Sequence, residues 1–103
     1  MDKIDVIARR ILGWKQNSLH KWYNHEEGLF IENFNPYENM EHAMLIVSRL
    51  ERFGFHYTKQ SETEACFSNA YVKECSSGDT LALAITNAAY SLAEVNTISS
   101  EWL

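Results

Sequence analysis

The stretch from Phe34 to Gly54 reads FNPYENMEHAMLIVSRLERFG and is the most fully specified part of the sequence. Pro36 keeps the preceding Asn35 out of the helical region, and Asn39 is a typical N-cap residue. One apolar stripe then recurs at three- and four-residue spacing: Met40, Ala43, Met44, Val47, Leu50 and Phe53. Gly54 stands where helices commonly end in a left-handed glycine. The stretch therefore predicts a central amphipathic helix against which the other segments pack.

The composition indicates one globular domain. Hydrophobic residues make up 46% of the 103 residues, and a second independent core would fall near the lower size limit for stability. Aromatic residues make up 13%, which is more rings than one small core hides, so we expect some at surfaces or interfaces. We assign residues 1–93 to the domain and residues 94–103 to a tail that folds back or lies at a subunit contact.

Charge and cysteine usage narrow the class of partners and the compartment. The net charge of −5 disfavours a long nucleic acid, because its phosphate backbone repels an acidic protein. No apolar run approaches the ~20 residues that cross a bilayer, so no membrane partner is expected. Cys66 and Cys75 lack CxxC spacing, and the first residues lack the apolar core of a signal peptide. These features predict a cytoplasmic protein with reduced thiols.

Periodicity predicts a helix and a hairpin before the central helix. A first helical stripe consists of Ile4, Ile7, Ala8, Ile11 and Leu12, and it ends at Gly13. Alternation over residues 19–24 and 29–32, joined by a turn at 25–28, predicts the hairpin.

A second hairpin and a last helix are predicted after the central helix. The hairpin strands are residues 55–60 and 65–74, joined by the polar residues 61–64. Asp79 is the expected N-cap of a helix over residues 80–92. The resulting order, α-β-β-α-β-β-α, predicts an α+β domain with one small antiparallel sheet.

The last helix carries two apolar stripes. The first is a core stripe of Leu81, Ala84, Ile85, Ala88 and Leu92. The second includes Ala93 and would be exposed in a monomer, so it is expected to be covered by another subunit or by the tail. The predicted interface of this homo-oligomer consists of Ala82, Leu83, Ala89, Tyr90 and Trp102.

The order of several short motifs resembles the phage ABA sandwich domain family. The motifs are ILGWK at residues 11–15, Trp22-Tyr23, Phe34-Asn35-Pro36, the central helix to Gly54, and the alanine-rich residues 80–92. The Gly-Trp and Asn-Pro pairs are the most specific parts, and the resemblance ends at Leu92. It implies an α/β/α sandwich encoded by a bacteriophage or prophage. It implies no established activity and no catalytic residue.

Rings, amides and basic residues gather in the sequence around the first predicted hairpin and the central helix. Aromatic faces and amides suit a base and a ribose, and a helix N-terminus or two arginines suit a phosphate. The candidate ligand-binding residues are Trp14, Lys15, His20, Trp22, Tyr23, Asn24, Asn33, Asn35, Tyr37, Arg49 and Arg52. The simpler interpretation is that Trp14 and Trp22 anchor the core or an interface, the asparagines form turns and caps, and the arginines pair with helix acids.

The sequence gives little support for a catalytic or metal-binding site. The histidines at positions 20, 25, 42 and 56 lack metal-site spacing, so no metal or other cofactor is predicted. Cys66 with His56 across the second hairpin is a possible nucleophile pair, but a buried thiol is the simpler role. A carboxylate hydrolase built on Glu26, Glu27 or Glu32 is a further alternative. No hydrolase or nucleotide-binding fingerprint occurs.

The sequence therefore favours a non-enzymatic phage-type binding protein. The leading hypothesis is an oligomeric anti-defence protein that sequesters a small anionic, nucleotide-like immune signal in the host cytoplasm. This hypothesis rests on the excess of rings, the two-faced last helix and the family context. The alternatives are an inhibitor that binds a host protein directly, a small hydrolase, and a structural component of the phage.

Overall fold

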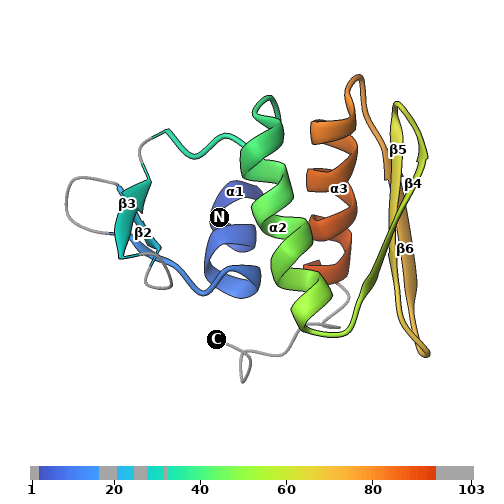
Figure 1. Cartoon of the computed structure of the whole chain (residues 1–103), viewed down its shortest axis with the longest axis horizontal. Helices are drawn as coiled ribbons and strands as arrows, with labels where there is room; N and C mark the ends of the chain where they lie inside the picture. Colours follow the sequence, from blue (N-terminus) through green and yellow to red (C-terminus); the bar gives the residue numbers. More distant parts are fainter. Residues whose placement is uncertain (1–2, 17–20, 25–27, 32, 95–103) are drawn as a thin grey trace.

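Three helices lie between two small antiparallel sheets in this computed structural model, which describes residues 3–16, 21–24, 28–31 and 33–94 (Figure 1). The elements are α1 (Lys3–Val6), its π-helical continuation η1 (Ile7–Ile11), β1 (Lys15–Gln16), β2 (Trp22–Asn24), β3 (Leu29–Ile31), α2 (Met40–Arg52), β4 (His56–Ser61), β5 (Glu64–Ser68), β6 (Lys73–Ser77) and α3 (Leu81–Glu94). The predicted α+β class is confirmed. The predicted single sheet is wrong, because the described strands form two separate three-stranded sheets.

The central helix begins and ends where the sequence predicts. The side-chain oxygen of Asn39 accepts hydrogen bonds from the backbone N–H groups of Glu41 (2.9 Å) and His42 (3.3 Å). Gly54 follows the last turn with φ +94°, a conformation that favours glycine. The predicted stripe is partly wrong, since Met40 and Met44 are exposed and Ile46 is buried in the core. The buried face of α2 is therefore turned away from its two N-terminal methionines.

The first helix widens into a π turn before it ends. The N–H of Leu12 donates to the carbonyl of Ile7 at 3.1 Å, and the N–H of Trp14 donates to that of Ala8 at 2.9 Å. The extra residue per turn broadens the buried face, so that Val6, Ile7 and Ala8 are buried in succession. Gly13 has φ +69° at the predicted end of the helix.

Sheet A consists of β1, β2 and β3 in that order and contains the predicted first hairpin. Trp22 pairs with Ile31, Tyr23 with Phe30, and Asn24 with Leu29. Strand β1, which pairs Lys15 with Tyr23, was not predicted, because two residues are too short for an alternating pattern. Residues 19–20, 25–27 and 32 of the predicted hairpin lie outside the described residues.

Sheet B consists of β4, β5 and β6, and it packs against α3 (Figure 1). The predicted strand over residues 65–74 is wrong, because it is a second hairpin made of β5 and β6. Asn69 makes the turn: its side-chain oxygen accepts from the N–H groups of Tyr71 (2.8 Å) and Val72 (3.0 Å). An Asn side chain that replaces backbone partners in this way is a turn former. Ala65 and Phe67 face the core of the domain and are buried.

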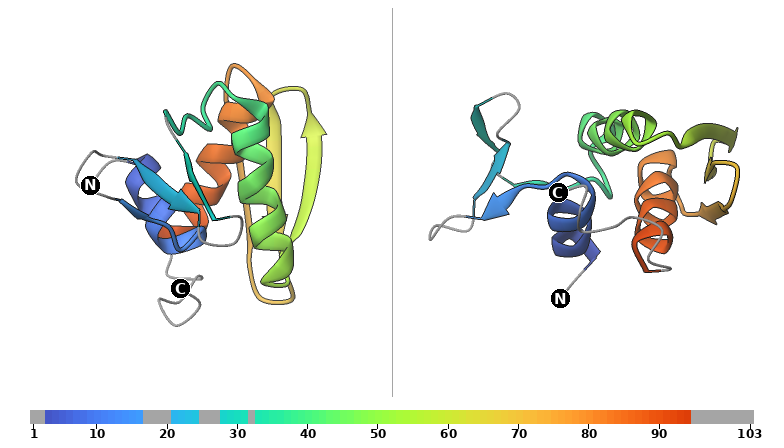
Figure 2. Two further views of the ribbon diagram at one scale, coloured as in Figure 1. Left: turned by 60° about the vertical axis from the view of Figure 1, so that its left-hand side comes forward. Right: turned by 90° about the horizontal axis from the view of Figure 1, so that it is seen from below.

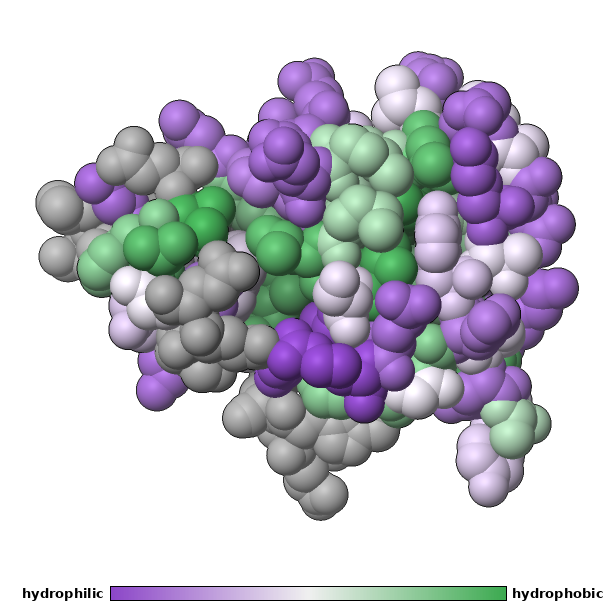
Figure 3. Space-filling model, in the orientation of Figure 1, coloured by the Kyte–Doolittle hydropathy of each residue, from purple (hydrophilic) through white to green (hydrophobic). Residues whose placement is uncertain are grey.

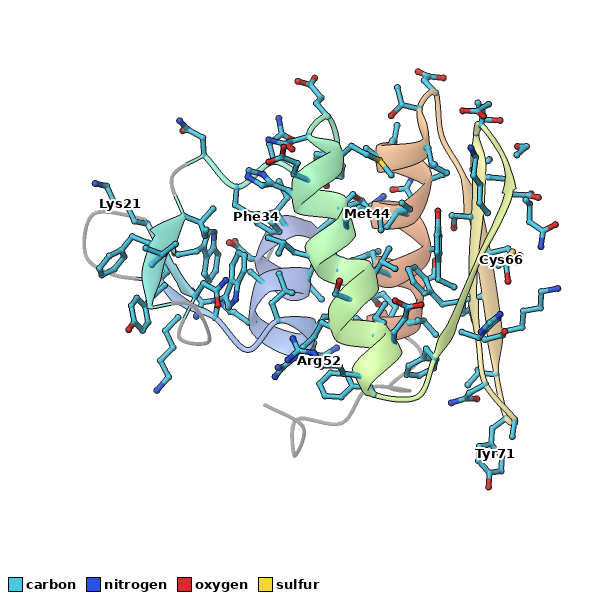
Figure 4. The ribbon with its side chains drawn as sticks, viewed as in Figure 1. Lys21, Phe34, Met44, Arg52, Cys66 and Tyr71 are labelled. Carbon is cyan, nitrogen blue, oxygen red and sulfur yellow. A yellow bond between two sulfur atoms is a disulfide. The ribbon has the colours of Figure 1, made fainter. Side chains whose placement is uncertain are left out.

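The two cysteines form a disulfide, so the prediction of free thiols is wrong. Cys66 in β5 lies directly opposite Cys75 in β6, with a Cα–Cα distance of 4.1 Å. The two cysteines are nine residues apart and lie opposite each other only because a turn separates β5 from β6. The prediction of a single strand over this region did not include that turn. The bond lies on the face of sheet B that points away from α3 (Figure 4).

Helix α3 is covered on both sides by its own chain. Ala82 and Ala89 are buried, and Leu83 and Tyr90 are partly buried, so the prediction that a monomer would expose this stripe is wrong. Sheet B lies against one side of α3, while α1, η1 and α2 contact it elsewhere (Figure 2). The N-cap prediction also changes, because the hydroxyl of Thr80, not Asp79, accepts from the N–H of Leu83 at 3.2 Å. Trp102 lies outside the described residues.

The strand count fixes the direction of the last two helices. Helix α2 descends in Figure 1, the three strands of sheet B run up, down and up, and α3 descends again. Two strands would have returned the chain at the opposite end and made α3 antiparallel to α2. Because there are three strands, α2 and α3 are parallel, and α1 with η1 ends at the same side of the molecule (Figures 1 and 2).

Loss of the disulfide is expected to destabilise the fold without abolishing it. The Cys66→Ala/Cys75→Ala variant should lose about 2–3 kcal/mol of unfolding free energy, the entropy of closing a loop of this length in the unfolded chain. Urea denaturation of the variant and of the oxidised protein measures the difference. A dithiothreitol-treated wild type is the control, and an unchanged midpoint in both would contradict a stabilising role.

Candidate functional site

Every arginine in the sequence lies near the converging C-terminal ends of the helices. These residues, which we call the arginine end, are Arg9, Arg10, Arg49 and Arg52. Figure 4 labels Arg52 at the lower end of α2, and Figure 3 shows the most hydrophilic surface colour gathered over the same region. The chain carries a net charge of −5, so this concentration of positive charge stands against an acidic background.

Two of the arginines bind the carbonyl groups in which other helices end. The Nε–H of Arg49 donates to the carbonyl oxygen of Ile11, the last residue of η1, at 3.2 Å. The Nη1 of Arg10 donates to the carbonyl oxygen of Ala93, near the end of α3, at 3.0 Å. Helix carbonyls at this end lack intrahelical donors and carry partial negative charge. The arginines therefore satisfy helix ends and join three helices together.

Arg9 connects the arginine end to sheet A. Its guanidinium carbon lies 5.0 Å from the centre of the Trp22 ring, within cation–π range. Its Nη2 lies 3.5 Å from Oε1 of Gln16 in β1. Arg9 is exposed, whereas Trp22 is buried, so the guanidinium lies over the ring on its solvent side.

A line of rings joins the residue before β1 to the central helix. The rings of Trp14 and Phe34 meet edge to face at 4.9 Å, and those of Phe34 and His42 lie 5.3 Å apart. Trp14 and Trp22 are only 4% and 5% exposed. A base has no free indole face to stack on, so both tryptophans have the simpler predicted role of core anchors.

The remaining ring and amide candidates do not form one pocket with the tryptophans. Lys15 and Tyr23 are paired across β1 and β2 on the outer face of sheet A, and Tyr23 contacts Phe30 with 5.0 Å between ring centres. Asn24 is buried. Asn33 is exposed and has φ +52°, a left-handed conformation that asparagine tolerates. His20 lies outside the described residues.

Asn35 and Tyr37 belong to the loop that leads into α2. The N–H of Asn35 donates to Nδ1 of His42 at 3.0 Å, and the N–H of Asn39 donates to the carbonyl of Asn35 at 2.9 Å. The buried hydroxyl of Thr86 lies 2.9 Å from the carbonyl oxygen of Pro36, which ties the loop to α3. These contacts are those of a folded turn, as the simpler interpretation predicts.

His42 is neutral in this arrangement. Its Nδ1 accepts a hydrogen bond, which requires an unprotonated nitrogen. Burial lowers the pKa of His42 below its ordinary value of 6.5, and the carboxylate of Glu41 offsets only part of that shift. Deprotonation of His42 is thus coupled to the closure of the loop before α2.

The described residues do not form the alternative catalytic or metal-binding sites. Cys66 is bonded to Cys75 and is not a free nucleophile for the proposed pair with His56. No group of three or more His, Cys, Asp or Glu side chains in the described ranges is placed to hold a metal ion. Glu26, Glu27 and Glu32 lie outside these ranges. None of the described helices is long and apolar enough to cross a membrane.

The sequence prediction included Arg49 and Arg52 but missed Arg9 and Arg10. The sequence did show Arg9 and Arg10 as an adjacent basic pair near the end of the first helical stripe. Its importance depends on which end of α2 lies beside it, and that is a tertiary contact with no local pattern.

Residues 5–90 match the family model described as the phage ABA sandwich domain. No curated protein and no solved structure matches the chain. The match covers the second half of α1, all of η1 and α2, both sheets and most of α3, and so includes all four arginines.

Replacing Arg49 is expected to destabilise the junction of η1 and α2. Arg49→Met should lower the unfolding free energy by about 1.5–3 kcal/mol, the usual worth of a hydrogen bond from a charged donor. Urea denaturation measures the change. Lys73→Met is the matched control, because Lys73 is an exposed cation on β6, and an equal loss in both variants would contradict the capping role.

The coupling of His42 to the loop predicts a pH dependence of stability. Because the folded pKa lies below the unfolded value of 6.5, the unfolded chain binds more protons in that interval. The contribution of His42 is therefore complete above pH 6.5 and is lost as the pH falls toward the lowered folded pKa. Denaturation of wild type and His42→Asn between pH 5 and 8 tests this. An identical pH dependence in both proteins would contradict it.

Proposed function

Because the chain belongs to the phage ABA sandwich domain family, we propose that it is a non-enzymatic phage binding protein that holds an anionic, nucleotide-like host molecule at its arginine end. The observation that carries the proposal is the convergence of every arginine on one end of an acidic protein. A local positive field in an acidic chain attracts small anions, while the net charge repels long nucleic acids.

Arginine is the side chain best suited to bind a phosphate. Its guanidinium has five N–H donors in a planar fork, so one side chain can bind a protein oxygen and an anion at the same time. The fork matches two oxygens of a phosphate at once, which gives both affinity and orientation. Phosphate groups of a nucleotide are therefore the chemistry that this end suits best.

Recognition of the base is assigned to Arg9 in place of the tryptophans. Trp14 and Trp22 are core residues, so the original stacking role does not fit them. The Arg9 guanidinium is exposed and already lies over the Trp22 ring. Bases stack on arginine planes as well as on aromatic rings, so Arg9 offers a stacking surface beside the phosphate-binding residues.

The biological role that follows is sequestration. A phage protein that holds a nucleotide-like immune signal in the host cytoplasm, without converting it, would act against host defence. The Cys66–Cys75 bond lies on the outer face of sheet B, so its reduction in that compartment would leave the arginine end in place.

The proposal predicts stabilisation by small anionic nucleotides. A panel of cyclic nucleotides and ADP-ribose derivatives should include a ligand that raises the melting temperature, with about 2.7 kcal/mol of stabilisation at one hundred times its dissociation constant. Arg9→Gln should weaken that ligand at least tenfold, whereas Lys73→Gln removes the same charge from β6 and should not. Mass spectrometry should recover the ligand unchanged after heat release.

Three outcomes would count against the proposal. No shift with any member of the panel would contradict nucleotide binding. Equal affinities in Arg9→Gln and Lys73→Gln would place the ligand elsewhere, and recovery of altered ligand would indicate an enzyme. Retention of a host protein from lysate by wild type, lost in Arg9→Gln, would favour the direct inhibitor.

A further inference from the structure

The two halves of the disulfide in sheet B differ in exposure. Cys66 is only 2% exposed, whereas Cys75 is an exposed residue. The difference follows from the strand order β4-β5-β6, because Cys66 lies in the middle strand and Cys75 in an edge strand. A reagent in solution therefore reaches Cys75 much more easily than Cys66.

The neighbours of Cys66 explain why it is enclosed on the outer face of the sheet. Ala65 and Phe67 face the core, so the alternation of a strand places Cys66 on the opposite face of β5 (Figure 4). There it lies between Thr58 of β4 on one side and Cys75 of β6 on the other. Beyond β6, sheet B has no further strand in the described chain, so Cys75 has a neighbouring strand on one side only.

The mechanism of thiol–disulfide exchange makes this asymmetry important. A thiolate attacks one sulfur of the disulfide and expels the other. The attacking, central and leaving sulfur atoms lie close to one line, so the thiolate approaches from the side opposite the leaving sulfur. For Cys75 that side is the open edge of β6, whereas for Cys66 it is the side on which Thr58 lies. Access therefore favours attack at Cys75.

We propose that Cys75 is a site of reversible exchange with a small-molecule thiol of the glutathione class, and that Cys66 is the resolving thiol. The incoming thiolate bonds to Sγ of Cys75 as the bond between the two cysteines breaks. Sγ of Cys66 leaves as a thiolate and takes a proton from water. In the reverse step the Cys66 thiolate attacks Sγ of Cys75 and expels the small thiolate. Each step breaks one S–S bond and forms one, so the small thiol is the only co-reactant.

The charges on the outer face of sheet B favour the same direction of attack. Lys73 precedes Cys75 by two residues in β6, so it lies on the same face at about 7 Å along the strand. Glu64 stands in the same relation to Cys66 in β5. Glu74 is paired with Phe67 and so lies on the other face. A thiolate and the carboxylates of glutathione are attracted by Lys73 and repelled by Glu64, which directs them toward Cys75.

The exchange makes the stability of sheet B depend on the thiols around the protein. Strands β5 and β6 remain joined by their pairing and by the turn at Asn69 when the disulfide opens. The site lies on the opposite side of sheet B from the helices that carry the arginines. The proposal is therefore independent of any ligand at the arginine end.

Two single-thiol variants of the full chain, Cys66→Ser and Cys75→Ser, test the difference in access. Both lack the disulfide, and serine nearly keeps the volume of cysteine, so each variant is the control for the other. With glutathione disulfide as the probe, Cys66→Ser should form the adduct roughly ten times faster than Cys75→Ser. Intact-mass spectrometry measures both rates. Equal rates, or a faster reaction at Cys66, would overturn the proposal.

Unfolding in urea shows whether the fold causes the difference. Both thiols are then exposed, so the two rates should become similar, and a difference that persisted would contradict the structural explanation. Circular dichroism without urea establishes that each variant has folded.

The resolving role of Cys66 is tested on reduced wild type, without substitution. After addition of glutathione disulfide, peptide mapping at early times should find the adduct on Cys75. The reaction should end with the Cys66–Cys75 bond and free glutathione, whereas Cys66→Ser keeps its adduct. An early adduct on Cys66, or a wild type that retains glutathione, would overturn the assignment.

Discussion

The structure depends on how three helix ends that meet at one side are neutralised. Helix C-termini carry partial negative charge, so placing several together is unfavourable unless cations or donors meet them. Arg10 and Arg49 do so by donating to the carbonyls of Ala93 and Ile11. Asp5 and Glu41 lie in the first turns of α1 and α2, at the opposite ends. These two carboxylates therefore lie where the helix dipoles favour negative charge.

The elements were largely predictable from sequence, but their directions were not. The Asn39 cap, the Gly54 end and the first apolar stripe are local patterns, and the structure confirms each. The turn at Asn69 divides one predicted strand into β5 and β6, and this one missed turn reverses the direction of α3. The end of α3, where the carbonyl of Ala93 accepts a hydrogen bond from Arg10, lies beside the arginines only because α2 and α3 run in the same direction. Arg9 and Arg10 were missed for a different reason, because the contact between η1 and α2 leaves no local pattern in the sequence.

Burial was harder to predict than secondary structure, for a physical reason. Trp14, Trp22 and the second stripe of α3 are apolar, and a sequence shows that such residues need cover without showing what covers them. Sheet B occupies one side of α3 and the other helices contact it elsewhere, which leaves no surplus face there. The disulfide was also hard to predict. Cys66 and Cys75 are close together only because β5 and β6 form a hairpin, and the alternation of the sequence did not show that hairpin.

The same packing leaves two surfaces of the described chain open to solvent. With α3, Trp14 and Trp22 enclosed, the large apolar side chains still exposed in the described chain include Leu29 and Phe30 of β3, and the strongest positive charge lies at the arginine end. Arg9 lies between the two, over Trp22 and beside Gln16 of β1. Arg9 is therefore the side chain through which sheet A and the helix ends contact each other.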